Sequence, residues 1–308
     1  MGRKRKGLPI HGWLVIDKPG GLSSSAVVGR VKRLTGAAKV GHAGTLDPLA
    51  TGVLPMALGE ATKTVSYLMD GTKAYRFTVR WGEARDTDDA EGKVTAESDR
   101  RPTAAEIEAV LPAFLGPIEQ TPPAYSAIKV DGRRAYDLAR NDQAPDLKPR
   151  TVVIQALDLV AVPDRDHAEF QAISGKGAYM RSLARDMAEK LGTCGHISAL
   201  RRTAVGPFRE NQAISLEMLE SVGHSAPLSE HLLPVDTVLD DIPALALTET
   251  EARKMSHGQA IPVLPVASRS PFKNIGQGDV VRAMADGRLV ALAKISGGEI
   301  RPFRIINL

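Results

Sequence analysis

Hydrophobic and polar residues alternate along three stretches of the chain, and each stretch predicts a β-strand with one buried face. These stretches are residues 73–81, 151–162 and 167–174. In the first of them Tyr75 and Phe77 fall on the same face. A short apolar run at residues 12–17 and the segment at residues 197–205, which carries Arg201 and Arg202, predict further strands.

Apolar residues at helical spacing predict helices between these strands. One helix follows the serines at positions 23–25, which are good N-cap residues, and ends at Gly36, a good C-cap. Further helices are predicted at residues 60–69, 103–115, 133–140, 179–191 and 249–255.

The 308 residues are enough for one large domain and one small one. Pro234 and Pro243 bracket a change in composition, after which short strands and glycine turns predominate. We therefore expect a larger domain over residues 8–238 and a small β-rich module over residues 239–308. A polar, proline-containing segment around residues 124–149 is predicted to form an insertion arm.

The charge is concentrated at one end of a mildly basic chain. The net charge is +4, but residues 1–40 carry nine Lys and Arg side chains against one acidic residue, Asp17. Such a concentration favours a polyanionic partner, nucleic acid first. A solvated basic tail followed by an ordinary basic helix is the alternative interpretation.

The sequence also argues against an internal disulfide, a membrane span and a calcium site. Cys194 is the only cysteine, so the chain can form no internal disulfide, which fits a reducing cytoplasm. The sequence has neither an 18-residue apolar run nor a secretory signal, so we expect a cytoplasmic protein without a membrane span. The acidic run at residues 86–92 lacks the spacing of a calcium-binding loop and is predicted to be a hairpin turn, with no metal.

Residues 40–52 contain three glycines, Pro48, His42 and a single acidic residue, Asp47. This composition predicts a tightly shaped loop. A carboxylate held in a rigid, partly apolar loop is a candidate nucleophile or base. The alternative is an Asp that caps a turn through its own backbone, as Asp before Pro often does.

Other residues have side chains that could form one pocket together with Asp47. Arg181, at the start of a predicted helix, could pair with a carboxylate and hold it ionised. Tyr75 and Tyr179 offer aromatic faces on which a nucleobase could stack. The side chains available for phosphates are Lys18, Arg30, Lys32, Arg201 and Arg202. No serine triad, metal cluster or dinucleotide fingerprint is present, which leaves catalysis by a single Asp on a nucleic acid.

The loop at residues 41–52, Gly-His-Ala-Gly-Thr-Leu-Asp-Pro-Leu-Ala-Thr-Gly, closely resembles the signature of the tRNA pseudouridine synthase B family. Four further segments resemble the family's motifs in the same order, at residues 73–77, 125–129, 174–181 and 199–203. The resemblance implies an α+β fold whose catalytic domain has a mixed, mainly antiparallel sheet flanked by helices. It also implies a C-terminal RNA-binding domain of the pseudouridine synthase and archaeosine transglycosylase type.

The resemblance also implies an activity, the isomerisation of uridine to pseudouridine at position 55 in the tRNA T loop, by base flipping and without cofactor or metal. It implies that Asp47 is the catalytic aspartate, that Tyr75 stacks on the target base and that Arg181 pairs with Asp47. The remaining implied roles are substrate binding by His42, Tyr179 and Leu200, support of the pocket by Lys18, and possible RNA backbone contacts by Arg30, Lys32, Arg33, Arg201 and Arg202. We expect a monomer that acts on tRNA.

Two other functions remain as alternatives. A non-catalytic RNA-binding or RNA-folding protein would use the same basic segment, but it would not need a set of Asp47, Tyr75 and Arg181. A small-molecule hydrolase with an Asp nucleophile would turn over without RNA, and it would leave the positive charge of residues 1–40 unexplained.

Overall fold

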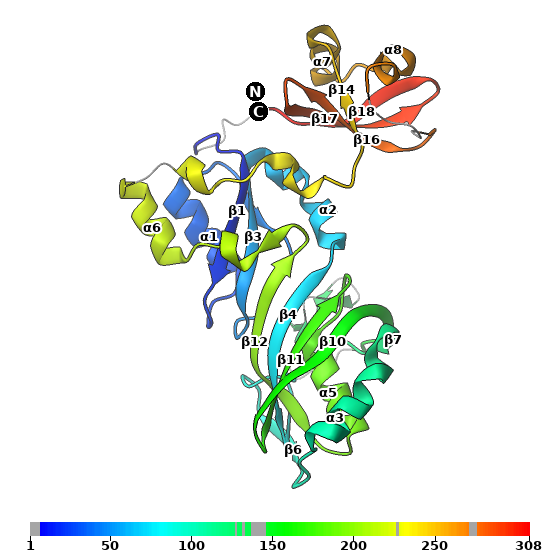
Figure 1. Cartoon of the computed structure of the whole chain (residues 1–308). Coiled ribbons are helices and arrows are strands. Elements are labelled where there is room, and N and C mark those ends of the chain that lie inside the picture. Colours follow the sequence, from blue (N-terminus) through cyan, green and yellow to red (C-terminus); the bar gives the residue numbers. More distant parts are fainter. Residues whose placement is uncertain (1–6, 127, 131–132, 137–145, 226–227, 271–275) are drawn as a thin grey trace.

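The computed structural model describes residues 7–126, 128–130, 133–136, 146–225, 228–270 and 276–308. The chain forms an elongated molecule with a larger domain and a smaller domain at one end (Figure 1). No helix in these ranges is long and apolar enough to cross a membrane.

The larger sheet contains nine strands within the described residues, and its main path runs β1-β3-β12-β4-β11-β10-β7. β12 pairs with β3 in parallel, and the other strand pairs of this sheet are antiparallel. The strands of the path are β1 (Gly12–Lys18), β3 (Thr51–Leu58), β4 (Lys73–Trp81), β7 (Gly116–Gln120), β10 (Arg150–Asp164), β11 (His167–Ser174) and β12 (Gly195–Val205), with β2 (Val40–His42) beside β3 and β13 (Phe208–Arg209) beside β12. The mixed, mainly antiparallel sheet and the α+β class are therefore confirmed.

Helices cover one face of this sheet in two groups (Figure 1). They are α1 (Ser24–Thr35) and α6 (Leu216–Ser225) near β1 and β2, and α3 (Ala104–Val110) near β10 with α5 (Met180–Lys190) near β12 and β4. The alternation of β4 points Phe77 into this layer, where its ring stacks on Phe170 with centroids 5.3 Å apart. Val31 of α1 and Leu183 of α5 belong to the same buried cluster.

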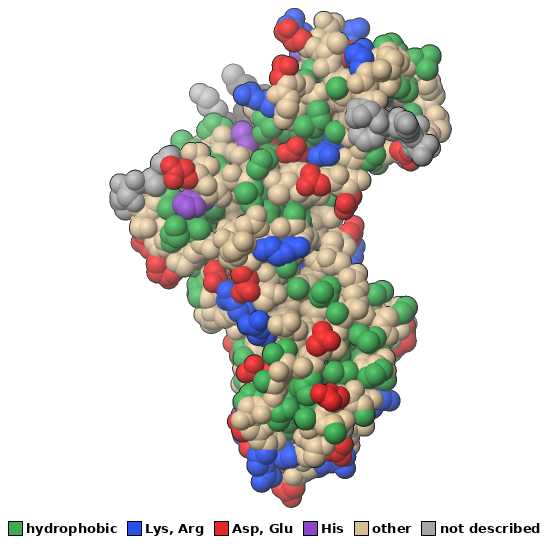
Figure 2. Space-filling view, in the orientation of Figure 1, with side chains coloured by type: hydrophobic (Ala, Val, Ile, Leu, Met, Phe, Trp, Pro, Cys, Tyr) green, Lys and Arg blue, Asp and Glu red, His purple; other side chains and the backbone are tan. Residues whose placement is uncertain are grey.

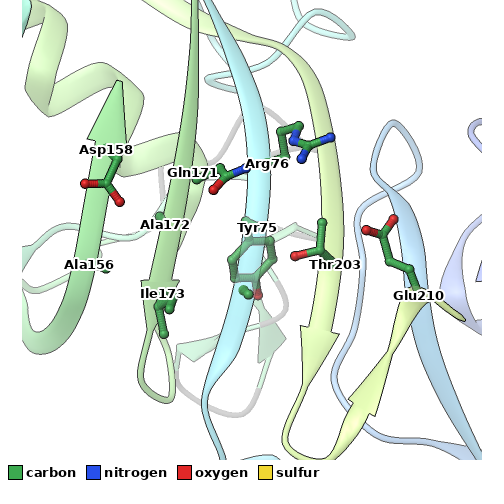
Figure 3. Close-up of a pocket in the computed structure, with 10 residues that line it drawn as sticks. Tyr75, Arg76, Ala156, Asp158, Gln171, Ala172, Ile173, Thr203 and Glu210 are labelled. Atoms are coloured by element: carbon green, nitrogen blue, oxygen red, sulfur yellow. The ribbon is translucent and has the colours of Figure 1, made fainter. Parts of the chain in front are cut away.

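The opposite face of β4, β11 and β10 is open to solvent. Arg76 and Gln171 are exposed there, and Ile173 is 41% exposed. A hollow of about 220 Å³ lies over these strands, with Asp158 and Glu210 also in its lining (Figure 3). Acidic and basic side chains lie interspersed over the larger domain in the view of Figure 2.

The smaller domain is built on a five-stranded sheet in the order β14-β16-β17-β18-β15. Its elements are β14 (Ala244–Ala246), α7 (Glu249–Ser256), β15 (Ile261–Pro262), α8 (Val263–Ala267), β16 (Val280–Ala285), β17 (Arg288–Ser296) and β18 (Glu299–Ile305). The expected boundary at residues 238–239 falls between the last strand of the larger sheet and β14.

The two domains share a hydrophobic cluster. Trp13 and Phe208 of the larger domain pack in one buried group with Leu292 and Ile306 of the smaller domain. Polar contacts flank this group. The Lys63 ammonium donates to the carbonyl oxygen of Ile305 at 2.7 Å, and the amide of Asn307 donates to the Glu60 carboxylate at 2.9 Å.

Some predicted elements differ from those observed. The helix expected at 103–115 is α for Ala104–Val110 and continues as a 3₁₀ turn over Leu111–Phe114, where Pro112 cannot donate to an α-helical hydrogen bond. The helix expected to begin at residue 133 is wrong at its start, because Arg133–Arg134 form β9 and pair with β8 (Lys129–Val130). Residues 137–140 of that prediction lie outside the described residues. The hairpin expected around residues 86–92 is confirmed, since it joins β5 (Glu83–Arg85) to β6 (Val94–Glu97).

Candidate active site

Asp47 lies in the loop that joins β2 to β3, and its side chain is 31% exposed. The end of this loop is fixed by a close backbone approach. Gly52 has a φ of +97°, and a Cβ atom there would lie 2.2 Å from the carbonyl oxygen of Arg202. Only glycine allows this approach, which brings β3 beside β12. The carboxylate therefore projects from a segment with little freedom to move.

Arg202 supports the first half of the loop from inside. Its side chain is buried, and its guanidinium donates to the carbonyl oxygens of Gly44 and Val53, both at 2.9 Å. Burial lowers the pKa of this guanidinium. The expected contact of Arg202 with an RNA backbone stays a prediction, and the burial of the side chain in this structure argues against it.

Lys18 supports the loop on the other side of Asp47. This buried side chain donates from Nζ to the carbonyl oxygens of Pro19 at 2.8 Å and Pro48 at 3.0 Å. Burial lowers the pKa of the ammonium to about 8, and the nearby Asp47 carboxylate opposes that shift. Lys18 therefore places a positive charge close to Asp47 and also binds the backbone of Pro48, the residue after Asp47.

Arg181 pairs directly with Asp47. Its Nε donates to Oδ2 of Asp47 at 2.9 Å, although the two residues lie 134 positions apart in the sequence. The other guanidinium nitrogens donate to the carbonyl oxygens of Thr87 at 2.8 Å and Tyr125 at 2.9 Å. A cation in the first turn of α5 is unfavourable for the helix dipole, so acidic partners are needed to stabilise it there. The side chain is 4% exposed, which strengthens these charge-assisted bonds.

Asp89 is a second acidic partner that sequence reasoning missed. Its Oδ2 lies 3.6 Å from Nε of Arg181, and its side chain is only 4% exposed. Its Oδ1 accepts hydrogen bonds from the Thr87 hydroxyl at 2.6 Å and from the Glu91 amide at 3.0 Å. The acidic turn predicted as a simple hairpin thus supplies a buried carboxylate to the site. The number of acidic residues in this turn is visible in the sequence. The sequence does not show which of their side chains points toward Arg181.

Tyr179 is positioned by two neighbouring strands. Its backbone exchanges hydrogen bonds with the side-chain amide of Gln120 at the end of β7, at 2.8 and 3.1 Å. The guanidinium of Arg150 lies over the Tyr179 ring, 5.3 Å from its centroid. Burial raises the pKa of the Tyr179 hydroxyl. Gln120 and Arg150 therefore fix an aromatic side chain directly before α5, and sequence reasoning identified neither.

The remaining predicted residues lie on adjacent strands. Tyr75, on β4, is half-buried and pairs in register with Arg202 of β12. Leu200, two residues before Arg202 in β12, is 8% exposed. His42 ends β2, and its buried Nδ1 has no hydrogen-bond partner in the described part of the chain. Burial lowers the pKa of His42, with a smaller contribution from the Arg202 charge.

Comparison with known proteins identifies the chain's relatives. A family model described as "TruB family pseudouridylate synthase (N terminal domain)" matches residues 32–180. A second, described as "tRNA pseudouridylate synthase B C-terminal domain", matches residues 181–240. The chain belongs to the TruB family of pseudouridylate synthases.

Relatives with the family's name are similar over the whole chain, and a solved structure shares the fold. A protein named tRNA pseudouridine synthase B from Rhodospirillum rubrum is 60% identical over 308 residues, with all of both chains covered. One of the same name from Gluconacetobacter diazotrophicus is 56% identical, over 99% of this chain and all of its own. The fold resembles a chain in the crystal structure of a Cbf5-Nop10-Gar1 complex, with a TM-score of 0.73 and 24% identity over 100% of this chain and 91% of that one.

The basic residues expected at the RNA backbone occupy different environments in this TruB-family chain. Lys32 and Arg33 are exposed in the last turn of α1, and Arg30 forms an exposed ion pair with Glu220 at 3.4 Å. Arg201 donates from its Nη atoms to both carboxylate oxygens of Asp17, at 2.9 and 3.0 Å, and it also pairs with Glu210. Its guanidinium thus has two carboxylate partners in this structure, and the expected phosphate contact of Arg201 stays a prediction. Within the described ranges no group of three or more His, Cys, Asp or Glu residues could hold a metal ion.

Replacing Arg202 with methionine is expected to lower the free energy of unfolding by about 2–3 kcal/mol, because buried carbonyl oxygens lose their donors. The adjacent Arg201 provides a matched control. Its side chain is 36% exposed, so Arg201→Met should cost about 1 kcal/mol or less. Urea unfolding followed by circular dichroism measures both changes. Equal losses would contradict the supporting function of Arg202.

Proposed function

We propose that this chain isomerises uridine to pseudouridine at position 55 in the T loop of tRNA. The observation that carries the proposal is the ion pair between Asp47 and the buried Arg181. Two relatives of 56% and 60% identity are named tRNA pseudouridine synthase B, which supports tRNA as the substrate. Non-catalytic RNA binding would not require an acid held in this way.

The reaction breaks the N1–C1′ glycosidic bond and forms a bond between C5 of the base and C1′. The base loses a proton from C5 and gains one at N1, so substrate and product have the same composition. The Asp47 carboxylate can attack C1′ or assist formation of a glycal, and both routes need it ionised beside the ribose. Arg181 favours that ionised form and fixes its direction through the Nε contact.

The target uridine must leave the helical stack before Asp47 can reach it. Extruding a base costs a few kcal/mol, and stacking on an aromatic ring returns roughly 1–3 kcal/mol. In this proposal Tyr75 stacks on the flipped base and takes part in removing the C5 proton. Tyr179 and Leu200 line the substrate pocket, and His42 helps to hold the flipped nucleotides.

The wider RNA contacts follow from the exposed basic side chains. We place Arg30, Lys32 and Arg33 of α1 against the RNA backbone, since phosphate contacts need accessible cations. The catalytic domain in this proposal spans residues 8–238, and residues 239–308 bind RNA in addition. The protein acts as a monomer in the cytoplasm.

The proposal is tested with a T-stem-loop RNA that carries tritium at C5 of uridine 55. Conversion releases the tritium to water, because C5 loses its hydrogen when it bonds to C1′. The same RNA labelled at another uridine is the control and should release none. Absence of release from position 55 under saturating enzyme would refute the proposed activity, and turnover of free uridine would favour the small-molecule alternative.

Replacing Tyr75 with phenylalanine is expected to preserve RNA binding and to slow turnover by about 10²- to 10⁴-fold. The ring that stacks on the base remains, but the hydroxyl linked to proton removal is lost. Single-turnover kinetics and a filter-binding titration with the same RNA separate the two effects. An unchanged single-turnover rate would leave the hydroxyl without a part in the reaction.

A further inference from the structure

Leu46, the residue before Asp47, is held by two hydrogen bonds to the side chain of Ser24. The hydroxyl of Ser24 donates to the carbonyl oxygen of Leu46 at 2.9 Å, and the amide of Leu46 donates back to the same hydroxyl at 2.8 Å. Ser24 is only 2% exposed, and Leu46 is 4% exposed. No solvent is therefore available to replace either bond, and each unpaired group would remain buried.

The hydroxyl of Ser24 is not needed to cap α1. Ser23 is the N-cap, and its side chain accepts a hydrogen bond from the amide of Ala26. Ser24 is the first residue of the helix, and its side chain turns instead to the loop. A hydroxyl can donate and accept at one atom, so a single serine pairs with Leu46 as a neighbouring strand would.

The residue after Asp47 is held as well. The carbonyl oxygen of Pro48 accepts hydrogen bonds from the amide of Gly21 at 2.8 Å and from Lys18 at 3.0 Å. The backbone is therefore tied on both sides of the carboxylate, and Ser24 provides the ties on the N-terminal side. The direction of the Asp47 side chain depends on both.

We propose that Ser24 is a positioning residue for Asp47, which sets the direction of the carboxylate toward C1′ through the backbone of Leu46. This inference rests on the proposed function of Asp47. It predicts a loss in the chemical step with little change in RNA affinity, because Ser24 itself touches no substrate. An error of 1 Å in the placement of a reacting group can slow a reaction by about 10²-fold.

The test compares Ser24→Ala with Ser23→Ala, its neighbour in the same helix turn. In single-turnover assays at saturating T-stem-loop RNA, Ser24→Ala should be slowed about 10- to 100-fold with Kd changed by less than about twofold. Ser23→Ala removes the helix cap and a hydroxyl contact with Ser25, and neither involves the Asp47 loop, so its rate should stay within about twofold of wild type. Ser24→Cys retains a weak donor and acceptor of similar shape and should fall between wild type and Ser24→Ala.

Amide hydrogen exchange at Leu46 reports the contact without any reaction. Exchange should be faster by about 10-fold or more in Ser24→Ala and unchanged in Ser23→Ala. A wild-type rate in Ser24→Ala, or an equal loss of rate in both alanine variants, would overturn the proposal. If Ser24→Ala does not fold, Ser24→Cys is judged by the same two readouts. Wild-type enzyme and Asp47→Asn are assayed in parallel, so a failure of the proposed function is seen independently of Ser24.

Discussion

Replacing Asp47 with asparagine is expected to abolish pseudouridine formation and to leave the fold and tRNA binding almost unchanged. The amide oxygen can still accept the hydrogen bond from Arg181, so the geometry of the pocket persists. It is neither a nucleophile nor a base, and the rate should fall on the order of 10⁴-fold. Tritium release in a single turnover measures the rate, and a binding titration with the same RNA measures the affinity.

A matched control for Asp47→Asn is Asp158→Asn. Asp158 is also an aspartate with solvent access, but it lines the hollow on the open face of the sheet. The control should retain the wild-type rate. Substantial conversion by Asp47→Asn would remove Asp47 from the mechanism, whatever its position in the loop.

Replacing Arg181 with methionine is expected to reduce both stability and turnover. The change leaves the buried Asp89 carboxylate without its cation and the carbonyl oxygens of Thr87 and Tyr125 without donors. Stranding a buried charge costs about 3–5 kcal/mol of unfolding free energy. The rate should fall by roughly 10²- to 10³-fold, since a positioned donor to the reacting carboxylate is lost. Urea unfolding and single-turnover kinetics measure the two losses.

The double variant Arg181→Met, Asp89→Asn separates these two effects. Removing the stranded charge should restore a large part of the stability, because the buried pair is then replaced as a whole. Turnover should stay low, because Asp47 still lacks its partner. Recovery of turnover together with stability would mean that Arg181 acts on the fold alone.

The elements of the fold could be predicted wherever their patterns were long. The alternation in β4 and β11 identified both strands, and the N-cap and C-cap around α1 set its limits. β2 has three residues and β7 has five, one of them Pro117, so neither shows a repeat that stands out from a loop. The insertion of β12 between β3 and β4 depends on long-range pairing, which has no local signal.

The sequence predicted which residues form the active site better than it predicted where their side chains lie. Arg201 and Arg202 are neighbours, yet one is bound to carboxylates at the surface and the other is buried under the Asp47 loop. Successive residues of a strand face opposite ways, and the sequence does not say which face holds the site. The roles of Asp89 and Ser24 could not be predicted for a similar reason, since they depend on contacts with distant segments of the chain.

The hydrophobic cluster shared by the two domains connects Ile306 and Asn307 to the strands beside the Asp47 loop. Ile306 is buried against the group that contains Trp13 of β1, and Asn307 binds Glu60, which lies in the 3₁₀ turn directly after β3. β1 is paired with β3 along its whole length, and β3 begins where the Asp47 loop ends. Ile306 and Asn307 therefore help to stabilise a strand pair that lies roughly 250 to 290 positions earlier in the sequence. The packing beside the Asp47 loop thus extends across the domain boundary, to residues that belong to neither of the strands that flank the loop.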